Sequence, residues 1–496
     1  MKSASVLMKN TLMLAASNIL MRLIAISFQS YLAASVGAAQ LGVFGIITSV
    51  ATVFATISIS GVRFSVTRLA AEESGRGNEY PLRLMGCAFL YGGIFGCGAG
   101  AFMYATARWI SFHYIGDVGA MLPLRVMALS MPWIALGGCV EGYFSAKQKV
   151  LRLISVQFLS QAARIAFVAI NMPQKSKMPA DILAGGYFIG EICFALGMLL
   201  LFVIENYGKK DLSQKKPYFK ALVKTAAPLA VSAYMRTGLS SLGQVIIPRG
   251  LKKAGMGSAG AFATYGIITQ MALPIVMFPA ALLGALGDIL IPRLTEAQVN
   301  GQKIGISYIV NRALRIGTIF SFGVMGVMLF YADGLGELIY KSGEAGFYIK
   351  TFAPLIPVIY IDSVTDGCLK GLGQQVYSMA YNVIEGAVNV CLLYFFLPRG
   401  AMLAYIAVMY IKEVLNAVLS INRLRKVTEV ELQEGSISVI FCTLGAWLIG
   451  AVISPSGVIL KITVYIAAYI TLLYIFSAIT RDDIKWILSN VSIKKA

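Results

Sequence analysis

The chain has 496 residues, of which 58% are hydrophobic and 13% are charged, and its formal net charge at pH 7 is +19. This balance excludes an ordinary soluble domain and favours a membrane protein. A large positive charge can indicate a nucleic-acid partner, but here the basic residues occupy alternate loops between apolar segments, so we expect no nucleic-acid binding.

Apolar segments of about 20 residues recur along the whole chain, and each is long enough to cross about 30 Å of hydrocarbon as a helix. These segments lack the polar and apolar alternation of a transmembrane β-barrel. The sequence therefore predicts an all-α polytopic membrane protein with about fourteen transmembrane helices. In chain order, the helices are expected to start near Val6, Gly42, Leu84, Leu122, Leu153, Ile182, Leu222, Ala261, Ile304, Phe352, Val376, Ala401, Ser436 and Gly457.

The basic residues predict the orientation of these helices. If the N-terminus is cytoplasmic, about 26 Lys and Arg residues lie in loops on the cytoplasmic side and about 11 on the other side. One of the cytoplasmic groups is Lys147, Lys149 and Arg152. This bias predicts a multi-pass protein of a bacterial cytoplasmic membrane, with both termini cytoplasmic and with anionic lipids as partners.

Residues for catalysis or metal binding are scarce. The seven cysteines lie in or beside apolar segments without a CxxC pair, which is typical of small hydrophobic residues. The only histidine, His113, falls in a predicted outer loop, and no Walker-type phosphate loop is present. We therefore expect no catalytic residues, no metal site, no cofactor and no enzyme activity.

Short motifs of the first half return in the same order in the second half, which indicates an internal duplication. The matched pairs lie about 214–230 residues apart and run in the same direction. They are Met21-Arg22 with Met235-Arg236, FGIIT at 44–48 with YGIIT at 265–269, GCVEGYF at 138–144 with GCLKGLG at 367–373, and AGGYFIGEI ending at Ile192 with IAVMYIKEV ending at Val414.

The duplication predicts two six-helix lobes related by a pseudo-two-fold axis along the membrane normal. A basic stretch separates the lobes, and two further helices follow the second one. The expected division is an N-terminal lobe at 1–206, a cytoplasmic linker at 207–220, a C-terminal lobe at 221–426, and two extra transmembrane helices with a cytoplasmic tail at 427–496.

Three motifs carry a resemblance to a known family. They are EGYFSAKQKV at 141–150, LSQAARI at 159–165 and the long segment that begins YGIITQMALPIVMFP at Tyr265. In this order they resemble the polysaccharide-transport branch of the multidrug/oligosaccharidyl-lipid/polysaccharide exporter superfamily, near the stage V sporulation protein B group and the lipid II type flippases. The resemblance implies two lobes around a central cavity that opens alternately to each side, and a cationic cavity in the lipid II flippases. Glu141 departs from the family pattern, which usually has Arg there, and Ala162-Ala163 stands where a Glu often precedes the arginine.

Three arginines fall at similar depths inside predicted helices. Counted from interfacial basic residues, Arg22, Arg236 and Arg164 lie roughly 18–20 Å into the membrane. A guanidinium in hydrocarbon is costly, so it normally faces protein or a water-filled cavity. Together these arginines are candidates for binding a diphosphate, because Arg forms bidentate, charge-assisted hydrogen bonds to phosphate oxygens. The alternative is structural pairing with Glu191, Glu385 or Glu413.

Arg63 is a further substrate-binding candidate with a weaker basis. It lies near Arg68 at the cytoplasmic end of its helix. Its side chain is long enough to reach the headgroups, so snorkelling or structural pairing is the alternative to substrate contact.

The acidic candidates concern ion coupling. Asp362, Asp366 and Lys370 follow an i, i+4, i+8 pattern, which predicts an Asp366–Lys370 pair. Asp362 then remains as a carboxylate for coupling to a proton or sodium ion. Glu191 and Glu413, which occupy matching positions in the two halves, are the rival candidates.

These features favour a monomeric secondary transporter that flips an undecaprenyl-diphosphate-linked oligosaccharide or a peptidoglycan precursor outward. A lipid-linked glycan, membrane lipids and a coupling ion are the expected partners. One alternative is a cation-coupled multidrug antiporter of the same superfamily, although Arg22 stands where such relatives commonly have an acidic residue. The other is a membrane scaffold for cell-envelope assembly that transports nothing.

Overall fold

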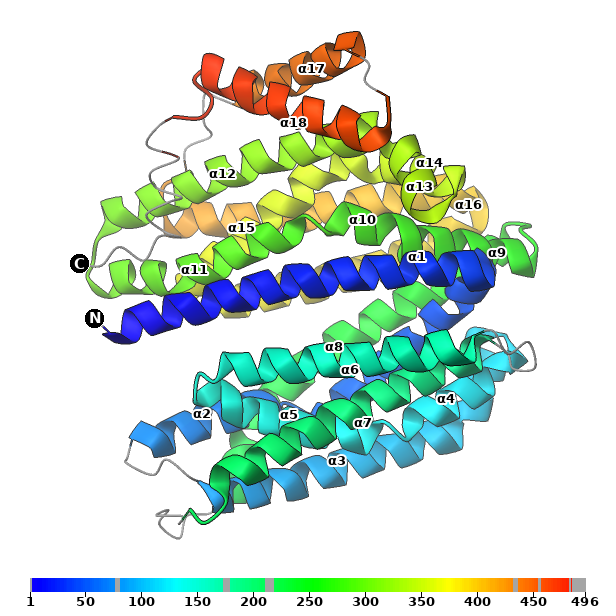
Figure 1. Cartoon of the computed structure of the whole chain (residues 1–496), viewed down its shortest axis with the longest axis vertical. Coiled ribbons are helices and arrows are strands. Elements are labelled where there is room, and N and C mark those ends of the chain that lie inside the picture. Colours follow the sequence, from blue (N-terminus) through cyan, green and yellow to red (C-terminus); the bar gives the residue numbers. More distant parts are fainter. Residues whose placement is uncertain are drawn as a thin grey trace. The chain divides into compact units, whose positions relative to one another are not determined.

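Every regular element in the described part of the chain is a helix (Figure 1). The computed structural model describes residues 2–75, 81–172, 179–209, 218–430, 436–453, 456–480 and 483. Within these residues, nine helical stretches are long and apolar enough to cross a membrane, and a bent helix pair, Val118–Ala128 with Met131–Ala146, makes a tenth. A helix begins or continues at or beside each of the fourteen predicted starts. The predicted all-α polytopic membrane architecture is confirmed.

The contacts within the chain divide it into two units. One unit combines Met1–Ala34 with Ile267–Ala496, and the other is Ser35–Gly266. The first helix is therefore shared between the units. The lobes expected at 1–206 and 221–426 remain a prediction, and most of the expected linker, at 210–217, lies outside the described residues.

The Ser35–Gly266 unit begins with the second part of α1 (Lys2–Ile59). Its strongest helix pairings are α6 with α7, α3 with α5, and α2 with α5. The remaining helices are α2 (Val62–Gly75), α3 (Leu82–Trp109), the π-helix η1 (Ile110–Ile115), the 3-10 helix η2 (Val118–Ala120), α4 (Met121–Ala128), α5 (Met131–Ala146), α6 (Val150–Asn171), α7 (Pro179–Asn206), α8 (Tyr218–Lys253) and α9 (Ser258–Gly266).

The other unit contains the first part of α1, which lies beside α10 and α11 (Figure 1). Its C-terminal helices α17 and α18 pack on α12 around Tyr465 and Tyr469. The remaining helices are the π-helix η3 (Ile267–Ala272), α10 (Leu273–Met277), α11 (Ala280–Val299), α12 (Lys303–Phe330), α13 (Ala332–Tyr340), α14 (Gly343–Phe352), the 3-10 helix η4 (Ala353–Leu355), α15 (Ile356–Gly371), α16 (Gln375–Val427), α17 (Ser436–Ile453) and α18 (Val458–Ile475).

Two helices are too long for one crossing, and each is broken once. α1 has 58 residues and α16 has 53, whereas one crossing needs about 20. α1 breaks at Gly37, where φ is 78°. α16 breaks at Ala401, where φ is 46° and Pro398 has removed a backbone donor nearby. Each long helix thus accounts for two of the predicted crossings.

Two glycines bring α1 and α9 into close contact just beyond the break at Gly37. A Cβ atom at Gly42 would lie 2.0 Å from the carbonyl oxygen of Phe262, and one at Gly266 would lie 2.2 Å from that of Ala38. Only glycine allows this approach, because any side chain would overlap the backbone of the opposite helix.

Candidate functional site

Two of the four candidate arginines pair with a glutamate. The guanidinium of Arg63 on α2 lies 2.9 Å from Glu141 Oε1 on α5. The guanidinium of Arg164 on α6 lies 3.3 Å from Glu191 Oε1 on α7. Structural pairing, the alternative that the sequence leaves open for both arginines, is therefore present.

The environment of Arg164 is built around this pair. Its guanidinium lies over the ring of Tyr187, 5.0 Å from the centroid, and the carboxylate of Glu191 is only 20% exposed. Gly190 provides the room, because a Cβ atom there would lie 3.1 Å from Arg164 Nε. Glu191, a coupling candidate, is thus compensated by a cation in this structure.

Arg22 has a different type of partner. Its Nη1 donates a hydrogen bond to the backbone carbonyl of Met277 at 2.9 Å. Met277 ends α10, where the last carbonyls of a helix lack a partner within the helix. Tyr360 donates to the adjacent carbonyl of Val276 at 2.7 Å. Arg22 thus helps to cap a break between helices, while its exposed side chain retains further N–H donors.

Arg236 lies near the middle of α8, and its side chain is exposed. In the described residues, neither Arg236 nor Arg22 forms an ion pair with a carboxylate. The two residues belong to different units, so their predicted convergence on one cavity remains a prediction.

The acidic stripe of α15 divides as its spacing predicts. Lys370 Nζ lies 2.6 Å from Asp366 Oδ2, which confirms the predicted pair. Asp362 instead accepts a hydrogen bond of 2.8 Å from Asn416 Nδ2 on α16. Its other oxygen, Oδ1, is buried, and no donor among the described residues reaches it. Asp362 is therefore a part-buried carboxylate whose neighbours are the amide of Asn416 and the hydroxyl of Ser420, with no cation paired to it among the described residues.

Glu413 has a partner that the sequence analysis missed. Lys412 Nζ lies 2.6 Å from Glu413 Oε1 and 3.0 Å from Glu385 Oε1, and all three side chains are less than a fifth exposed. Both glutamates lie within electrostatic range of Asp362. The described side chains here comprise three acids and one lysine, so negative charge is in excess.

These acids do not form a metal centre of the usual type. In the described ranges, no group of three or more His, Cys, Asp or Glu side chains is placed to hold a metal ion.

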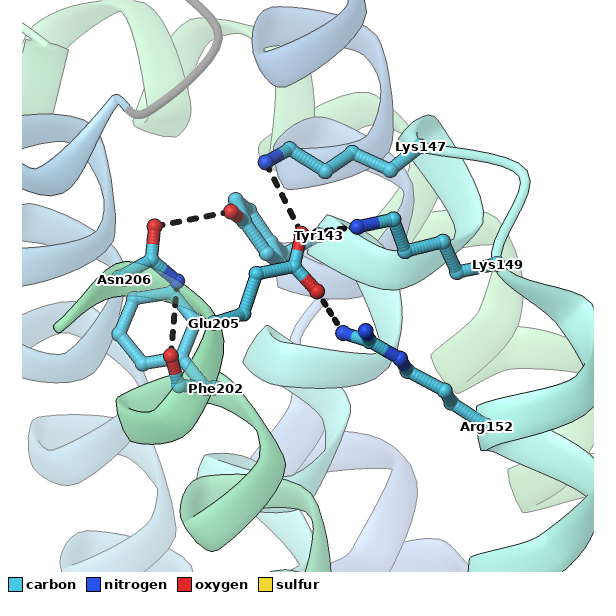
Figure 2. Close-up of polar contacts among 7 residues, drawn as sticks. All are labelled: Tyr143, Lys147, Lys149, Arg152, Phe202, Glu205 and Asn206. Atoms are coloured by element: carbon cyan, nitrogen blue, oxygen red, sulfur yellow. Dashed lines mark hydrogen bonds and ion pairs between the residues drawn. The ribbon is translucent and has the colours of Figure 1, made fainter. Parts of the chain in front are cut away.

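A further charged network was missed because its basic residues were interpreted only as indicators of topology. Glu205 on α7 is 6% exposed and lies 3.1 Å from Lys147 Nζ and 2.5 Å from Lys149 Nζ. It also pairs with Arg152 (Figure 2). Beside it, Tyr143 donates a hydrogen bond of 3.0 Å to Asn206 Oδ1. The network joins the turn between α5 and α6 to the end of α7.

A model of the family described as "Polysaccharide biosynthesis protein" matches residues 7–298. The chain is 23% identical to the stage V sporulation protein B of Bacillus subtilis (strain 168), covering 96% of this chain and 97% of the relative. It is 21% identical to the sporulation protein YkvU of the same strain, covering 69% of this chain and 78% of the relative.

Solved structures share the fold. The lipid II flippase MurJ in an inward closed conformation matches with a TM-score of 0.71 at 12% identity, covering 94% of this chain and 98% of that one. An inward-facing multidrug resistance MATE family transporter of the MOP superfamily matches with a TM-score of 0.62 at 14% identity, covering 82% and 94%. The resemblance inferred from the sequence motifs is confirmed.

Proposed function

Because this chain belongs to the polysaccharide biosynthesis protein family, we propose that it flips a lipid-linked glycan across a bacterial membrane by alternating access. The chain is a multi-pass membrane protein that shares the fold of a lipid II flippase and of a MATE transporter, which supports a transporter and not an enzyme. The proposed substrate is an undecaprenyl-diphosphate-linked oligosaccharide or a peptidoglycan precursor.

The observation that carries this proposal is the charge balance of the four arginines. Arg63 and Arg164 are neutralised by glutamates, whereas Arg22 and Arg236 have no described carboxylate. An unpaired guanidinium within the membrane costs at least about 2.5–3.5 kcal/mol on insertion scales. A diphosphate supplies the missing anion and accepts bidentate hydrogen bonds from Arg.

In this proposal, Arg22 and Arg236 bind the diphosphate, and Arg63 and Arg164 position the helices around it. Capping the carbonyl of Met277 orients Arg22 while its remaining donors face the substrate. The lobes at 1–206 and 221–426 supply one arginine each, so a monomer suffices. The distribution of the basic loops supports a cytoplasmic position for both termini.

We propose that Asp362 couples transport to a proton or a sodium ion. Once the diphosphate leaves, the carrier must return with two uncompensated arginines within the membrane, which is costly. Asp362 supports this role because its Oδ1 is buried without a hydrogen-bond partner among the described residues, and because its neighbours Asn416 and Ser420 carry no charge. An ion bound there would select one arrangement of the lobes by differential affinity.

The test of substrate binding is flipping of a fluorescent polyprenyl-diphosphate sugar in proteoliposomes. We expect Arg22→Ala and Arg236→Ala each to reduce the rate at least about tenfold, since each removes charged hydrogen bonds worth about 1.5–3 kcal/mol. The Lys variants should retain part of the rate, because a point charge attracts phosphate without the bidentate geometry.

Arg399→Ala is the matched control. Arg399 also donates to a backbone carbonyl, that of Phe395 at 3.0 Å, and its side chain is exposed. Its removal should leave flipping unchanged. Wild-type rates in both Arg22→Ala and Arg236→Ala, with normal protein levels, would contradict the proposal.

The excess of acids around Asp362 and Lys412 favours a second candidate, a multidrug antiporter for organic cations. The two functions differ in their response to Arg22→Ala. In an antiporter, loss of the positive charge of Arg22 should increase uptake of a fluorescent organic cation. A flippase should show no such uptake, either in the parent protein or in Arg22→Ala. A non-transporting scaffold would show neither activity.

A further inference from the structure

Helices α2 and α8 of the Ser35–Gly266 unit enclose a groove of 680 Å³. α2 contributes Phe64, Arg68 and Glu72, which are four residues apart and therefore lie on one face of the helix. α8 also contributes one face, made of Ala221, Lys224, Thr225 and Pro228. We refer to this feature as the α2–α8 groove.

A close helix contact fixes the groove. A Cβ atom at Gly61 would lie 2.7 Å from the carbonyl oxygen of Ala226, so the two helices touch there without an intervening side chain. Ser60 Oγ and Tyr234 Oη, 2.5 Å apart, hold the same junction. The α2–α8 groove lies alongside this contact, which makes it part of the folded unit.

The proline in α8 frees a backbone acceptor on a residue that lines the groove. Pro228 has no N–H, so the carbonyl of Lys224, four residues earlier, loses its helical donor. An unpaired carbonyl requires a hydrogen bond from another donor when water is excluded.

The charges of the α2–α8 groove sum to one positive charge. Arg68 Nε lies 3.1 Å from Glu72 Oε1, and the side chains are 70% and 41% exposed, so this surface pair is weak but neutral. Lys224 is exposed and has no described ion-pair partner. Phe64, which is 65% exposed, and Pro228 give the groove apolar walls.

We propose that the α2–α8 groove binds the headgroup of a monoanionic glycerophospholipid from the surrounding bilayer. Lys224 and Arg68 bind the phosphodiester, while Glu72 and the carbonyl of Lys224 accept hydrogen bonds from headgroup hydroxyls. The first acyl methylenes pack on Phe64. A single excess charge matches one phosphodiester, whereas a diphosphate carries more charge, so the site is distinct from Arg22 and Arg236.

The experiment measures retention of phosphatidylglycerol by the purified full-length protein in phosphatidylcholine micelles, using native mass spectrometry. We expect Lys224→Gln to weaken phosphatidylglycerol binding about tenfold, since it removes one charge-assisted hydrogen bond. Lys220→Gln is the matched control: it removes the same charge one turn away on α8, from an exposed residue that does not line the groove. It should leave binding unchanged.

Two further variants separate charge from shape. Ala221→Phe fills the α2–α8 groove without a change in charge and should weaken binding as much as Lys224→Gln does. Glu72→Gln raises the excess charge to two and should shift the preference toward dianionic phosphatidic acid. Thermal unfolding of each variant without added lipid verifies that it is folded.

Three results would overturn the proposal. If Lys220→Gln and Lys224→Gln weaken phosphatidylglycerol binding equally, the lipid is held by general attraction to the positive surface and not by the groove. Displacement of phosphatidylglycerol by glycerol 1-phosphate at equal concentration would show a site for free anions. Stronger displacement by a polyprenyl diphosphate would make the groove part of the substrate path.

Discussion

At the residue scale, the membrane arginines differ in what neutralises them. Removing one partner of a buried ion pair leaves an uncompensated charge, whereas replacing both partners by apolar residues is often neutral. Arg164 and Glu191 are 31% and 20% exposed, so water reduces the penalty without abolishing it. Comparing the single and the double replacement therefore tests whether Arg164 has a structural role or binds the substrate.

We expect Arg164→Leu to lower the free energy of unfolding by about 1–3 kcal/mol, because it leaves Glu191 unpaired. The double variant Arg164→Leu/Glu191→Leu should recover most of that loss in thermal unfolding of the purified protein. If Arg164→Leu abolishes flipping and leaves stability unchanged, Arg164 is a substrate ligand instead.

Asp362→Asn tests ion coupling. The amide keeps the shape and the contact with Asn416 but cannot take up a proton and lacks the negative charge that holds a sodium ion, so transport should lose its dependence on one imposed gradient. Proteoliposomes with separate pH, sodium and voltage gradients identify which one. Asp366→Asn, at a residue already paired with Lys370, is the control. An unchanged dependence on all three gradients in Asp362→Asn would move the coupling site to Glu413 or Glu191.

Sequence spacing predicts pairs within one helix and not those between helices. Asp366–Lys370 follows from the i, i+4 rule. Arg164–Glu191 and Lys412–Glu385 are each separated by 27 residues, so they depend on which helices pack together. In the sequence, Glu141 is only a departure from the family pattern, because its partner Arg63 lies on another helix.

At the element scale, one carboxylate joins three helices. The turn between α5 and α6 passes through Gln148, whose φ is 54°. Two backbone hydrogen bonds close this turn: the N–H of Lys147 donates to the carbonyl of Tyr143, and the N–H of Lys149 donates to that of Phe144. This tight turn brings both lysines to Glu205 at the end of α7. The network therefore stabilises the order of packing at this end of the unit.

Glu205→Gln should destabilise the protein by about 1–3 kcal/mol, because the amide leaves three neighbouring cations to repel one another. Thermal unfolding in detergent measures the effect. Glu72→Gln, which breaks only an exposed i, i+4 pair with Arg68, should change stability by less than about 0.5 kcal/mol. A Glu205→Gln protein as stable as the parent would show that the network adds nothing to folding.

The helices themselves followed from hydropathy, but not all of their breaks did. Gly37 is a residue type that accepts positive φ, so a break there is compatible with the sequence. Ala401 is not, and only the preceding Pro398 and Gly400 point to an irregular backbone. The approach of Gly42 to α9 depends on the partner helix, which a single segment does not specify.

At the scale of the whole molecule, the orientation in the membrane is a prediction that labelling can test. In a chain with all seven cysteines replaced, Lys149→Cys should react with an impermeant maleimide only from the cytoplasmic side. His113→Cys should react only from the outer side. Both side chains are accessible, with Lys149 38% exposed. Reaction of both positions from the same side would refute the predicted topology.

The internal repeat predicts which segments of the two halves correspond. The contacts in the structure divide the chain at other points. Sequence similarity relates Arg22 to Arg236 because both follow a methionine in matching helices. In the structure, residues up to Ala34 join the unit of Ile267–Ala496, while α8 joins Ser35–Gly266. A periodic pattern defines the apolar face of a helix but not the bundle that covers it.

This sharing of α1 sets an order for biosynthesis. Arg22 leaves the ribosome 255 residues before Met277, the carbonyl that it caps. At about 5–20 residues per second, the first helix waits on the order of 10–50 s for that partner. During this interval its guanidinium depends on headgroups, water or the insertion machinery. The first helix is therefore made long before the rest of its own unit, whereas Ser35–Gly266 can pack as it emerges.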